Sequence, residues 1–351
     1  MRALFVGLGG IGQRHLRILR SLVPHDQLEV HAFRTLGRGE KLRDDLTVED
    51  DRDLVTDYNI VVHSEVQDAL AVKPEVVFIC NPSSFHAPIA LQAAKAGAHL
   101  FIEKPLSHSL DGLDELLAVV KSNQLVCYVG YNFRFHPALI RLKELLDQDY
   151  FGNILSVHSE IGEYLPSWHR YEDYRKMYAA RADLGGGVIL SQIHEMDLIY
   201  WYFGLPKSIY CQGGKLSHLE IDVEDNATSL MQYGGRKGGF SISLHQDYLQ
   251  RPSVRRFKIV GADGIAEIDL ISNQMKVFRA DGELQEQWDG TDFQRNDMFV
   301  GQMRHFLACV SGESSPKVNL RDGMQSLRLA LAAKASMASN SIVYLSNQAD
   351  S

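Results

Sequence analysis

Three glycines near the start of the chain have the spacing of a phosphate-binding loop. Residues 7–12 read Gly-Leu-Gly-Gly-Ile-Gly, a GxGxxG pattern, directly after an apolar run at residues 3–6. In such a loop one glycine makes the tight turn, the next admits phosphates to the backbone, and the third lets helix and strand pack closely. The pattern predicts a dinucleotide site, and a purely structural glycine turn is the alternative. The expected cofactor contacts in this loop are Gly7, Gly9, Gly10, Ile11 and Gly12.

The elements that would position this loop alternate through the first 130 residues. Strand-like runs occur at residues 3–6, 28–33, 59–63, 75–80, 99–103 and 125–129. Helix-patterned stretches lie between them at residues 11–22, 66–72, 88–96 and 113–122. Apolar strands joined by helices indicate a parallel sheet buried on both faces, which is the doubly wound Rossmann architecture. We therefore expect an NAD(P)-binding domain over residues 1–130.

The pattern changes after residue 130. A helix is expected at residues 137–146, followed by strand-like runs at residues 154–161, 208–213, 227–233, 239–244, 256–260, 264–269 and 274–278. Further helices are expected at residues 188–202, 298–310 and 322–338. Short glycine-containing turns between the strands indicate an open, mainly antiparallel sheet in an α+β domain over residues 131–351. Because open sheet faces commonly pair with a second copy, we expect a homodimer or homotetramer.

Composition excludes several function classes. The 351 residues carry a formal net charge of −8, which argues against binding to nucleic acid or to an acidic membrane surface. No apolar stretch reaches the length of a membrane span. The four cysteines lie far apart with no CxxC spacing, and no metal site is expected. The first residues already belong to a strand, which leaves no room for a signal peptide, so we expect a cytoplasmic protein.

The end of the second strand bears on the choice of dinucleotide. NAD-binding units usually place an acid about 20 residues past the glycines, on the ribose 2′-hydroxyl. Here the strand ends at Arg34 and Thr35, and Glu29 lies too early for that role. Arg34 would bind the 2′-phosphate of NADP with help from the Thr35 hydroxyl. This predicts NADP, with NAD as the alternative. In the alternative interpretation, Arg34 and Arg38 are solvated loop cations that stack on the adenine.

Further segments follow the strands at recognisable spacing. They are Asn81-Pro82-Ser-Ser-Phe-His86, Glu103-Lys104-Pro105-Leu106, Gly130-Tyr-Asn132-Phe-Arg134-Phe-His136-Pro137, and Gly185-Gly-Gly187 with His194-Glu-Met-Asp197. Over nearly the whole chain and in this order, they resemble the glucose–fructose oxidoreductase, inositol dehydrogenase and rhizopine-catabolism family (Gfo/Idh/MocA). The resemblance implies a Rossmann domain, a second domain whose sheet mediates oligomerisation, and NAD(P)-dependent oxidation or reduction of a sugar or cyclitol carbon.

The same resemblance implies roles for particular residues. The lysine of the Glu-Lys-Pro segment is catalytic in that family, and the glutamate beside it lies at the nicotinamide ribose; here these are Lys104 and Glu103. The family histidine after the glycine run corresponds to His194. Further expected cofactor contacts are Asn81, Pro82 and His86. The chain departs from the family at Leu190, where an Asp or Asn is common, and a shift of the turn would place Ser191 or Gln192 there instead.

The chemistry of these residue types fits hydride transfer, which needs a group to take or give the hydroxyl proton. Lys104 lies at the carboxyl end of a sheet strand, where doubly wound folds bind ligands. A salt bridge between Glu103 and Lys104 is the alternative, and the opposite directions of adjacent strand residues weaken it. His194 would relay the proton or hold the substrate hydroxyl, and a packed helical histidine without a chemical role is its alternative.

Several residues are expected to contact a carbohydrate substrate. Asn132 and Arg134 lie at the domain junction, where pockets are common, and an interdomain anchor is the alternative. The segment 163–175 is rich in aromatic and basic residues that could stack on a sugar or bind an anion, and a dimer-contact loop is the alternative. Its arginines hint at an anionic or nucleotide-linked sugar. The candidates in this segment are Trp168, His169, Arg170 and Arg175.

Two classes of function remain open from the sequence. One is an NAD(P)-dependent oxidoreductase that acts on a sugar or cyclitol, with Lys104 as acid/base and His194 as its assistant. The other is a non-catalytic nucleotide-sensing or scaffold protein that uses the Rossmann fold without turnover. The intact Glu-Lys-Pro segment favours the enzyme, whereas Leu190 keeps the second class open.

Overall fold

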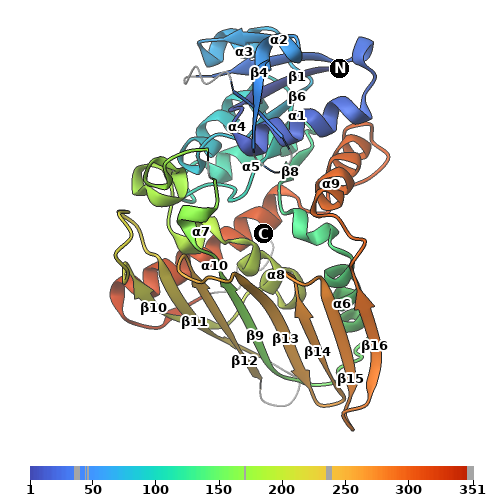
Figure 1. Cartoon of the computed structure of the whole chain (residues 1–351), viewed down its shortest axis with the longest axis vertical. Coiled ribbons are helices and arrows are strands. Elements are labelled where there is room, and N and C mark those ends of the chain that lie inside the picture. Colours follow the sequence, from blue (N-terminus) through green and yellow to red (C-terminus); the bar gives the residue numbers. More distant parts are fainter. Residues whose placement is uncertain (35–39, 44, 46, 170, 235–238, 346–351) are drawn as a thin grey trace.

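The chain forms two large sheets that lie one above the other, with helices packed around and between them, and one small two-stranded sheet (Figure 1). The computed structural model describes residues 1–34, 40–43, 45, 47–169, 171–234 and 239–345. The N-terminal sheet lies at the top of Figure 1 and the C-terminal sheet at the bottom, and the chain crosses between them more than once.

The N-terminal sheet has six parallel strands in the order β5-β2-β1-β6-β7-β8. Its strands are β1 (Arg2–Val6), β2 (Glu29–Phe33), β5 (Ile60–His63), β6 (Val76–Ile79), β7 (His99–Ile102) and β8 (Cys127–Val129). The connecting helices include α1 (Gly10–Leu22), α3 (Val66–Ala71), α4 (His86–Lys95) and α5 (Leu113–Ser122). The strand order reverses between β1 and β6, and this switch point is where doubly wound folds bind ligands. The predicted Rossmann architecture is confirmed.

A small insertion after β2 escaped the sequence pattern. The strands β3 (Glu40–Leu42) and β4 (Val48–Asp53) form a short antiparallel pair, and the single turn α2 (Leu54–Asp57) follows. The strand β4 reads Val-Glu-Asp-Asp-Arg-Asp, and its charged residues carry no apolar alternation. Because pairing is local here and no broad apolar face is buried, periodicity could not reveal it.

The C-terminal sheet has nine strands in the order β16-β15-β14-β13-β9-β12-β11-β10-β17. They are β9 (Ile154–Gly162), β10 (Ser208–Gly214), β11 (Asn226–Tyr233), β12 (Phe240–Asp247), β13 (Val254–Gly261), β14 (Gly264–Asp269), β15 (Gln274–Arg279), β16 (Leu284–Asp289) and β17 (Val343–Tyr344). Neighbouring strands are antiparallel except β9 and β12, which pair in parallel. The expectation of an open, mainly antiparallel sheet is confirmed. The strands β16 and β17 were not predicted.

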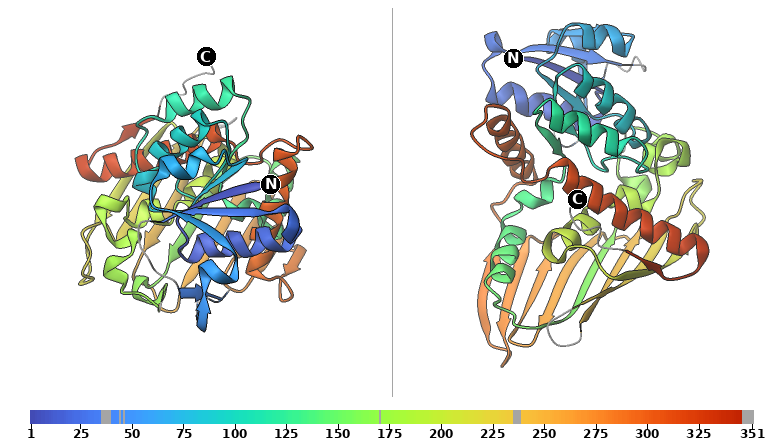
Figure 2. Two further views of the ribbon diagram at one scale, coloured as in Figure 1. Left: turned by 90° about the horizontal axis from the view of Figure 1, so that it is seen from above. Right: turned by 180° about the vertical axis from the view of Figure 1, so that it is seen from behind.

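Helices cover one face of this sheet, as the two views of Figure 2 show. They are α6 (Pro137–Asp147), α7 (Val188–Ser191), α8 (His194–Phe203) and α10 (Leu320–Ser339). Inward residues of the central strands, such as Ile242 and Leu244, are fully buried beneath them. None of the described helices combines the length and the apolar character needed to cross a lipid bilayer.

The single helix expected at residues 188–202 is wrong, because the structure breaks it between α7 and α8. Gln192 lies at the break, where its side-chain amide donates to the Asp247 carbonyl at 2.9 Å. The side-chain amide of Gln246 donates in turn to the Gln192 carbonyl at 3.0 Å. These bonds come from strand β12, so a tertiary contact overrides a helical period that continues through the break.

The helix α9 (Arg295–Val310) follows the last long strand of the C-terminal sheet but packs against the N-terminal one. Figure 2 shows it beside α1. Phe306 on α9 lies edge-on to Phe78 and Phe101 of the parallel sheet, with ring centroids 5.6 and 5.3 Å apart. One hydrophobic core therefore joins residues of the first 130 positions to residues near position 300.

Candidate active site

A cavity of about 1610 Å³ lies between the two sheets. One end is lined by the glycine loop and by the residues that follow β1 and β6. The other end reaches the end of β9 and the start of β13. A dinucleotide and a sugar-sized substrate would need a continuous space of this kind. Clefts at such junctions are where ligand sites are most often found.

The glycine loop has the shape that a pyrophosphate requires. Gly7 has φ +90° and lies in the region that disfavours side chains. A Cβ on Gly12 would come within 2.3 Å of the Gly7 carbonyl oxygen, so only glycine lets α1 approach this closely. A Cβ on Gly9 would instead project into open space. Gly10 and Ile11 begin α1 and line the cavity, where the first N–H groups of the helix have no side-chain cap. The loop fits a dinucleotide.

The remaining expected cofactor contacts surround this loop. Arg34, Asn81 and Pro82 line the cavity, and Thr35 lies outside the described residues. His86 also lines it, but its two ring nitrogens are bonded to the carbonyl oxygens of Pro105 and Asn81, and burial lowers its pKa. This ring therefore fixes the backbone after β6 and β7.

Glu103 lies beneath the glycine loop and is almost fully buried. Its carboxylate is 2.6 Å from Nε2 of His15 on α1 and accepts the backbone N–H of Lys104 at 3.1 Å. The side chains of Glu103 and Lys104 thus point in different directions, and they form no salt bridge with each other. Glu103 lines the cavity while it joins α1 to the end of β7.

The ammonium group of Lys104 lies across the cavity from the glycine loop, against the break between α7 and α8. Its Nζ donates to the backbone carbonyl of Ser191 at 2.9 Å. Lys104 is absent from the ion pairs found among the described residues, so a neutral carbonyl holds it in place without a counter-charge. This hydrogen bond orients the Lys104 side chain and uses one N–H of the ammonium, so the other two N–H groups can contact a substrate hydroxyl.

His194 begins α8 and also lines the cavity. Its ring packs edge-on against Tyr131 and Phe133, with centroids 5.9 and 4.9 Å away, and its Nδ1 has no hydrogen-bond partner in the described part of the chain. Burial holds the pKa of His194 well below its ordinary value, and the charges of Lys104 and Arg255 act in the same direction. The imidazole is therefore neutral at physiological pH.

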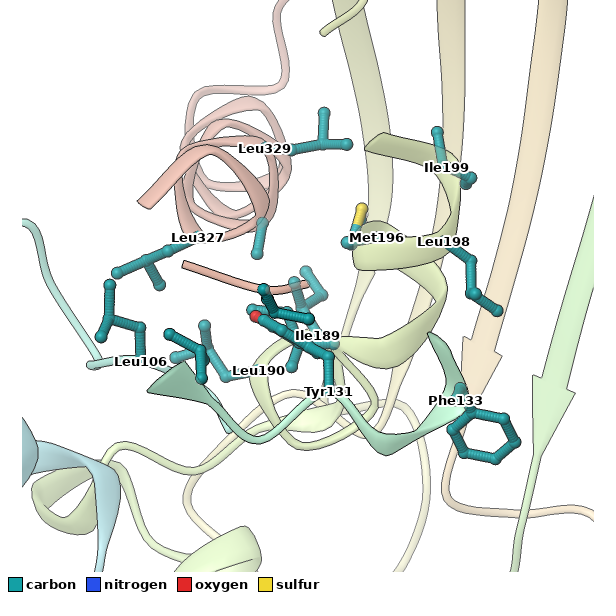
Figure 3. Close-up of a cluster of buried hydrophobic side chains, with 14 of the residues drawn as sticks. Leu106, Tyr131, Phe133, Ile189, Leu190, Met196, Leu198, Ile199, Leu327 and Leu329 are labelled. Atoms are coloured by element: carbon teal, nitrogen blue, oxygen red, sulfur yellow. The ribbon is translucent and has the colours of Figure 1, made fainter. Parts of the chain in front are cut away.

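The structure explains the departure at Leu190. This side chain is 2 % exposed and lies in the hydrophobic cluster between α7 and α10, near Leu106 (Figure 3). The next residue, Ser191, brings its backbone carbonyl rather than its hydroxyl to Lys104. Gln192 lines the cavity, but its side-chain amide N–H is already donated to the Asp247 carbonyl. The group that contacts the Lys104 ammonium is thus a backbone oxygen, which no sequence pattern could single out.

The segment expected to recognise substrate forms one wall of the cavity. Trp168 and His169 both line it, and Nε1 of Trp168 is buried without a partner. His169 is bonded to Glu172 at 2.9 Å, and Arg170 lies outside the described residues. Arg175 is not among the lining residues: it is half exposed and paired with Asp173 and Glu220. Arg175 as a substrate contact is therefore not supported.

Asn132 lines the cavity, whereas Arg134 does not. The Arg134 guanidinium donates to both carboxylate oxygens of Asp197, at 2.9 and 2.7 Å, and both side chains are almost completely buried. It also lies over the ring of Trp201. This geometry matches the interdomain anchor that the sequence left open, not a substrate contact.

Among the lining residues that the sequence analysis missed are three arginines from the C-terminal half of the chain, because nothing in their local sequence marks them. Arg251 and Arg255 come from the start of the β13 segment, and Arg295 is the first residue of α9. The neighbours Arg255 and Arg256 differ only in the face of the strand on which they lie: Arg255 lines the cavity, whereas the side chain of Arg256 is 64 % exposed. Strand register decides which of them belongs to the site.

Comparison with known proteins matches both parts of the chain. Residues 1–131 match the family described as "Oxidoreductase family, NAD-binding Rossmann fold", and residues 139–267 match the "GFO/IDH/MocA C-terminal domain". This chain belongs to the GFO/IDH/MocA family. It is therefore an oxidoreductase built on an NAD-binding Rossmann fold, and the interpretation as a non-catalytic scaffold is set aside.

Relatives of GFO/IDH/MocA type align over nearly the full length. The chain is 25% identical over 340 residues to the uncharacterized oxidoreductase YrbE of Bacillus subtilis, which covers 95% of this chain and 93% of that protein. It is 24% identical over 351 residues to the myo-inositol 2-dehydrogenase of Thermotoga maritima, which covers 96% of each. Among solved structures, the WlbA dehydrogenase of Bordetella pertussis in complex with NADH and UDP-GlcNAcA has a TM-score of 0.79 at 20% identity, with 99% of each chain covered. Levoglucosan dehydrogenase in complex with NADH has a TM-score of 0.81 at 17% identity, also with 99% of each covered.

Proposed function

We propose that this family member oxidises or reduces a carbohydrate or cyclitol carbon, with Lys104 as the acid/base group and His194 as its assistant. The observation that carries the proposal is the Lys104 ammonium, which the Ser191 carbonyl holds in the same cavity as the glycine loop. The curated relative that acts on myo-inositol and the solved relative with bound levoglucosan support a polyhydroxylated substrate.

The cofactor contacts would come from the glycine loop and from the residues after β2, β6 and β7. When bound, a nicotinamide dinucleotide supplies the hydride acceptor or donor. In the oxidative direction the neutral amine form of Lys104 takes the hydroxyl proton and becomes the ammonium, and in the reductive direction the ammonium form gives that proton to the carbonyl oxygen. Because His194 is neutral, it can donate one hydrogen bond to a substrate oxygen and adds no charge next to Lys104. Phe133 and Phe299 add apolar surface to the wall of the cavity.

Replacement of the lysine tests this proposal. Lys104→Met removes the proton-transfer group and should lower kcat by about 10²- to 10⁴-fold, with cofactor affinity almost unchanged. A control, Lys95→Met, changes an exposed lysine at the end of α4 that pairs with Glu115 and should leave kcat as it is. Both are measured by NAD(P)H absorbance with a panel of sugars and cyclitols, and cofactor affinity by fluorescence. Full activity of Lys104→Met would refute the assignment.

We further propose that the enzyme prefers NADP over NAD. Arg34 supports this because it lines the cavity at the end of β2, where NAD-specific units place an acid. The comparison is equilibrium binding of NADPH and NADH to the parent protein and to Arg34→Ala. NADPH should bind more tightly to the parent, and the variant should lose that preference. Tighter NADH binding in the parent would refute the preference for NADP and establish NAD.

We also propose that the uncovered face of the C-terminal sheet pairs with a second copy of the chain. The described helices lie on the other face (Figure 2). On β11 the side chains that point outward include Leu230, which is 54% exposed. A large open sheet with an exposed leucine on its uncovered face is typical of an association surface.

A further inference from the structure

The cavity is rich in positive charge, although the chain as a whole is acidic. The formal net charge of the protein is −8. Among the described residues that line the cavity, eight are arginine or lysine and four are glutamate. The basic ones are Arg14, Arg34, Lys104, Lys176, Arg181, Arg251, Arg255 and Arg295, and the acidic ones are Glu40, Glu103, Glu163 and Glu172. A cavity of opposite sign to its protein concentrates anionic ligands.

Two of these arginines, Arg255 and Arg295, lie close to His194 and come from segments far from the glycine loop in the sequence. The Arg255 guanidinium carbon is 4.0 Å from the centroid of the Phe133 ring, and the centroid of that same ring is 4.9 Å from the His194 ring. The positive charges of Arg255 and Arg295 both lower the pKa of His194. Arg255 and Arg295 are therefore within reach of a substrate that is held at Lys104 and His194.

The hydrogen-bonding capacity of Arg255 is only partly used. Its Nε donates to Glu195 at 2.6 Å, and its buried Nη2 has no hydrogen-bond partner among the residues that the structure describes. Glu195 is almost fully buried, so this contact fixes the guanidinium plane. A fixed guanidinium with an unused N–H edge is suited to a planar or tetrahedral anionic group.

Arg295 is the second cation. It is absent from the ion pairs and hydrogen bonds found among the described residues, and its side chain is open to the solvent of the cavity. Desolvation by the cavity walls lowers the pKa of Arg295, and the like charge of Arg255 lowers it further, while the carboxylate of Glu163 acts in the opposite direction. Both cations line one cavity and the charge of Arg255 acts against that of Arg295, so an anion that contacts both would relieve their repulsion.

We propose that Arg255 and Arg295 bind an anionic oxygen group, a carboxylate or a phosphate, that the substrate carries close to its reacting carbon. The substrate class is then an acidic or phosphorylated sugar rather than a neutral one. This inference rests on the proposed carbohydrate oxidoreductase function and adds the charge of the substrate to it. It replaces Arg134 and Arg175, whose charges are used elsewhere, as the basis for an anionic substrate.

The test compares sugars that differ only in charge. The probes are hexoses, their uronates and their 6-phosphates, offered to the cofactor-saturated protein. Turnover is followed by NAD(P)H absorbance, and binding by the shift of the unfolding temperature. At least one acidic sugar should have a kcat/KM or an affinity about 10-fold or more above that of its neutral counterpart. The uronate and phosphate arms show which anionic group the site takes.

Variants then assign the effect to the arginines. Arg295→Met should weaken binding of the acidic sugar about 10- to 100-fold more than it weakens binding of the neutral sugar, since one charge-assisted contact with the anionic group is lost. Its control, Arg304→Met, changes an exposed arginine on the same helix. Arg255→Met is made together with Glu195→Gln, so that no buried carboxylate is left unpaired. Arg256→Met is the control on the same strand, on the opposite face.

Each outcome decides the proposal. The proposal is supported if Arg295→Met loses the preference for acidic over neutral sugars and Arg304→Met keeps it. Equal use of neutral and acidic sugars by the parent, or a charge preference that survives both cavity variants, overturns it. If acidic sugars bind through Arg295 but none is turned over, the anion site stands and the proposed oxidoreductase activity on these sugars fails. If no acidic sugar binds, the anion site is refuted whatever the turnover of neutral sugars.

Discussion

The buried pair of Arg134 and Asp197 gives the sharpest test of how the two parts of the chain are joined. Arg134 follows β8 of the N-terminal sheet and Asp197 lies on α8, beside the C-terminal sheet. Their side chains are 4 % and 1 % exposed. Arg134→Met removes the cation and leaves the carboxylate in the core, where the Ser326 hydroxyl, at 2.9 Å, is its one remaining side-chain donor among the described residues.

The size of the effect follows from that burial. Breaking a buried ion pair by removal of one partner costs about 3–5 kcal/mol of unfolding free energy. For a cooperative unit of 351 residues, this corresponds to a fall in Tm of about 4–7 °C. Adding Asp197→Leu should recover much of the loss, because the uncompensated charge is then gone. Kd for the cofactor should not change, since neither residue lines the cavity.

Urea unfolding and calorimetry of the single and double variants measure these changes. The control is Arg256→Met, which breaks a largely exposed contact with Asp269 and should cost about 1 kcal/mol or less. The two interpretations of Arg134 give opposite results. If Arg134→Met raised KM by an order of magnitude while the unfolding free energy stayed within about 1 kcal/mol of the parent, Arg134 would be a substrate contact and the anchor interpretation would be wrong.

The remaining predictions concern pH, the glycine loop and association. The folded protein holds the pKa of His194 below its ordinary value, so as the pH falls below about 6.5 the unfolded chain binds a proton that the folded protein does not, and the unfolding free energy falls. Urea unfolding between about pH 5 and 8 should therefore show a steeper decrease of the unfolding free energy on acidification in the parent than in His194→Gln. Equal slopes would contradict this prediction. Gly12→Ala should lower both Tm and cofactor affinity, since its Cβ would lie 2.3 Å from the Gly7 carbonyl oxygen. Gly9→Ala should lower only cofactor affinity, because its Cβ would meet no protein atom but would project into the cavity where the phosphates are expected. A normal Tm for Gly12→Ala would show that the loop relaxes. Leu230→Asp on the open sheet should yield a monomer by light scattering, and an unchanged mass would exclude this face as the contact.

Much of the fold could be predicted because its signals are local. The six parallel strands are short apolar runs, and the glycine spacing from Gly7 to Gly12 is typical of a dinucleotide-binding turn. The break at Gln192 could not be predicted, because Ile189, Ile193 and Met196 continue a helical period through it. Only the bonds from β12 explain why the chain stops being helical there.

The site was predicted where its residues follow strands of the parallel sheet. Lys104 and Asn132 lie at the carboxyl ends of neighbouring strands, and topology brings them together. Arg255 and Arg295 could not be found in this way, because one depends on strand register and the other comes from a helix some 190 residues beyond Lys104. Arg134 and Arg175 were better candidates by sequence, since nothing there shows that each already has a carboxylate partner.

The return of α9 to the N-terminal sheet determines how this protein can be divided. A fragment that ends near residue 130 would lack Phe299, Met303 and Phe306, and the aromatic side chains they cover would face water. Such a fragment should require the α9 peptide in trans to become soluble and well ordered. The boundary between the two units is thus a property of the three-dimensional core and not of a single cut in the polypeptide.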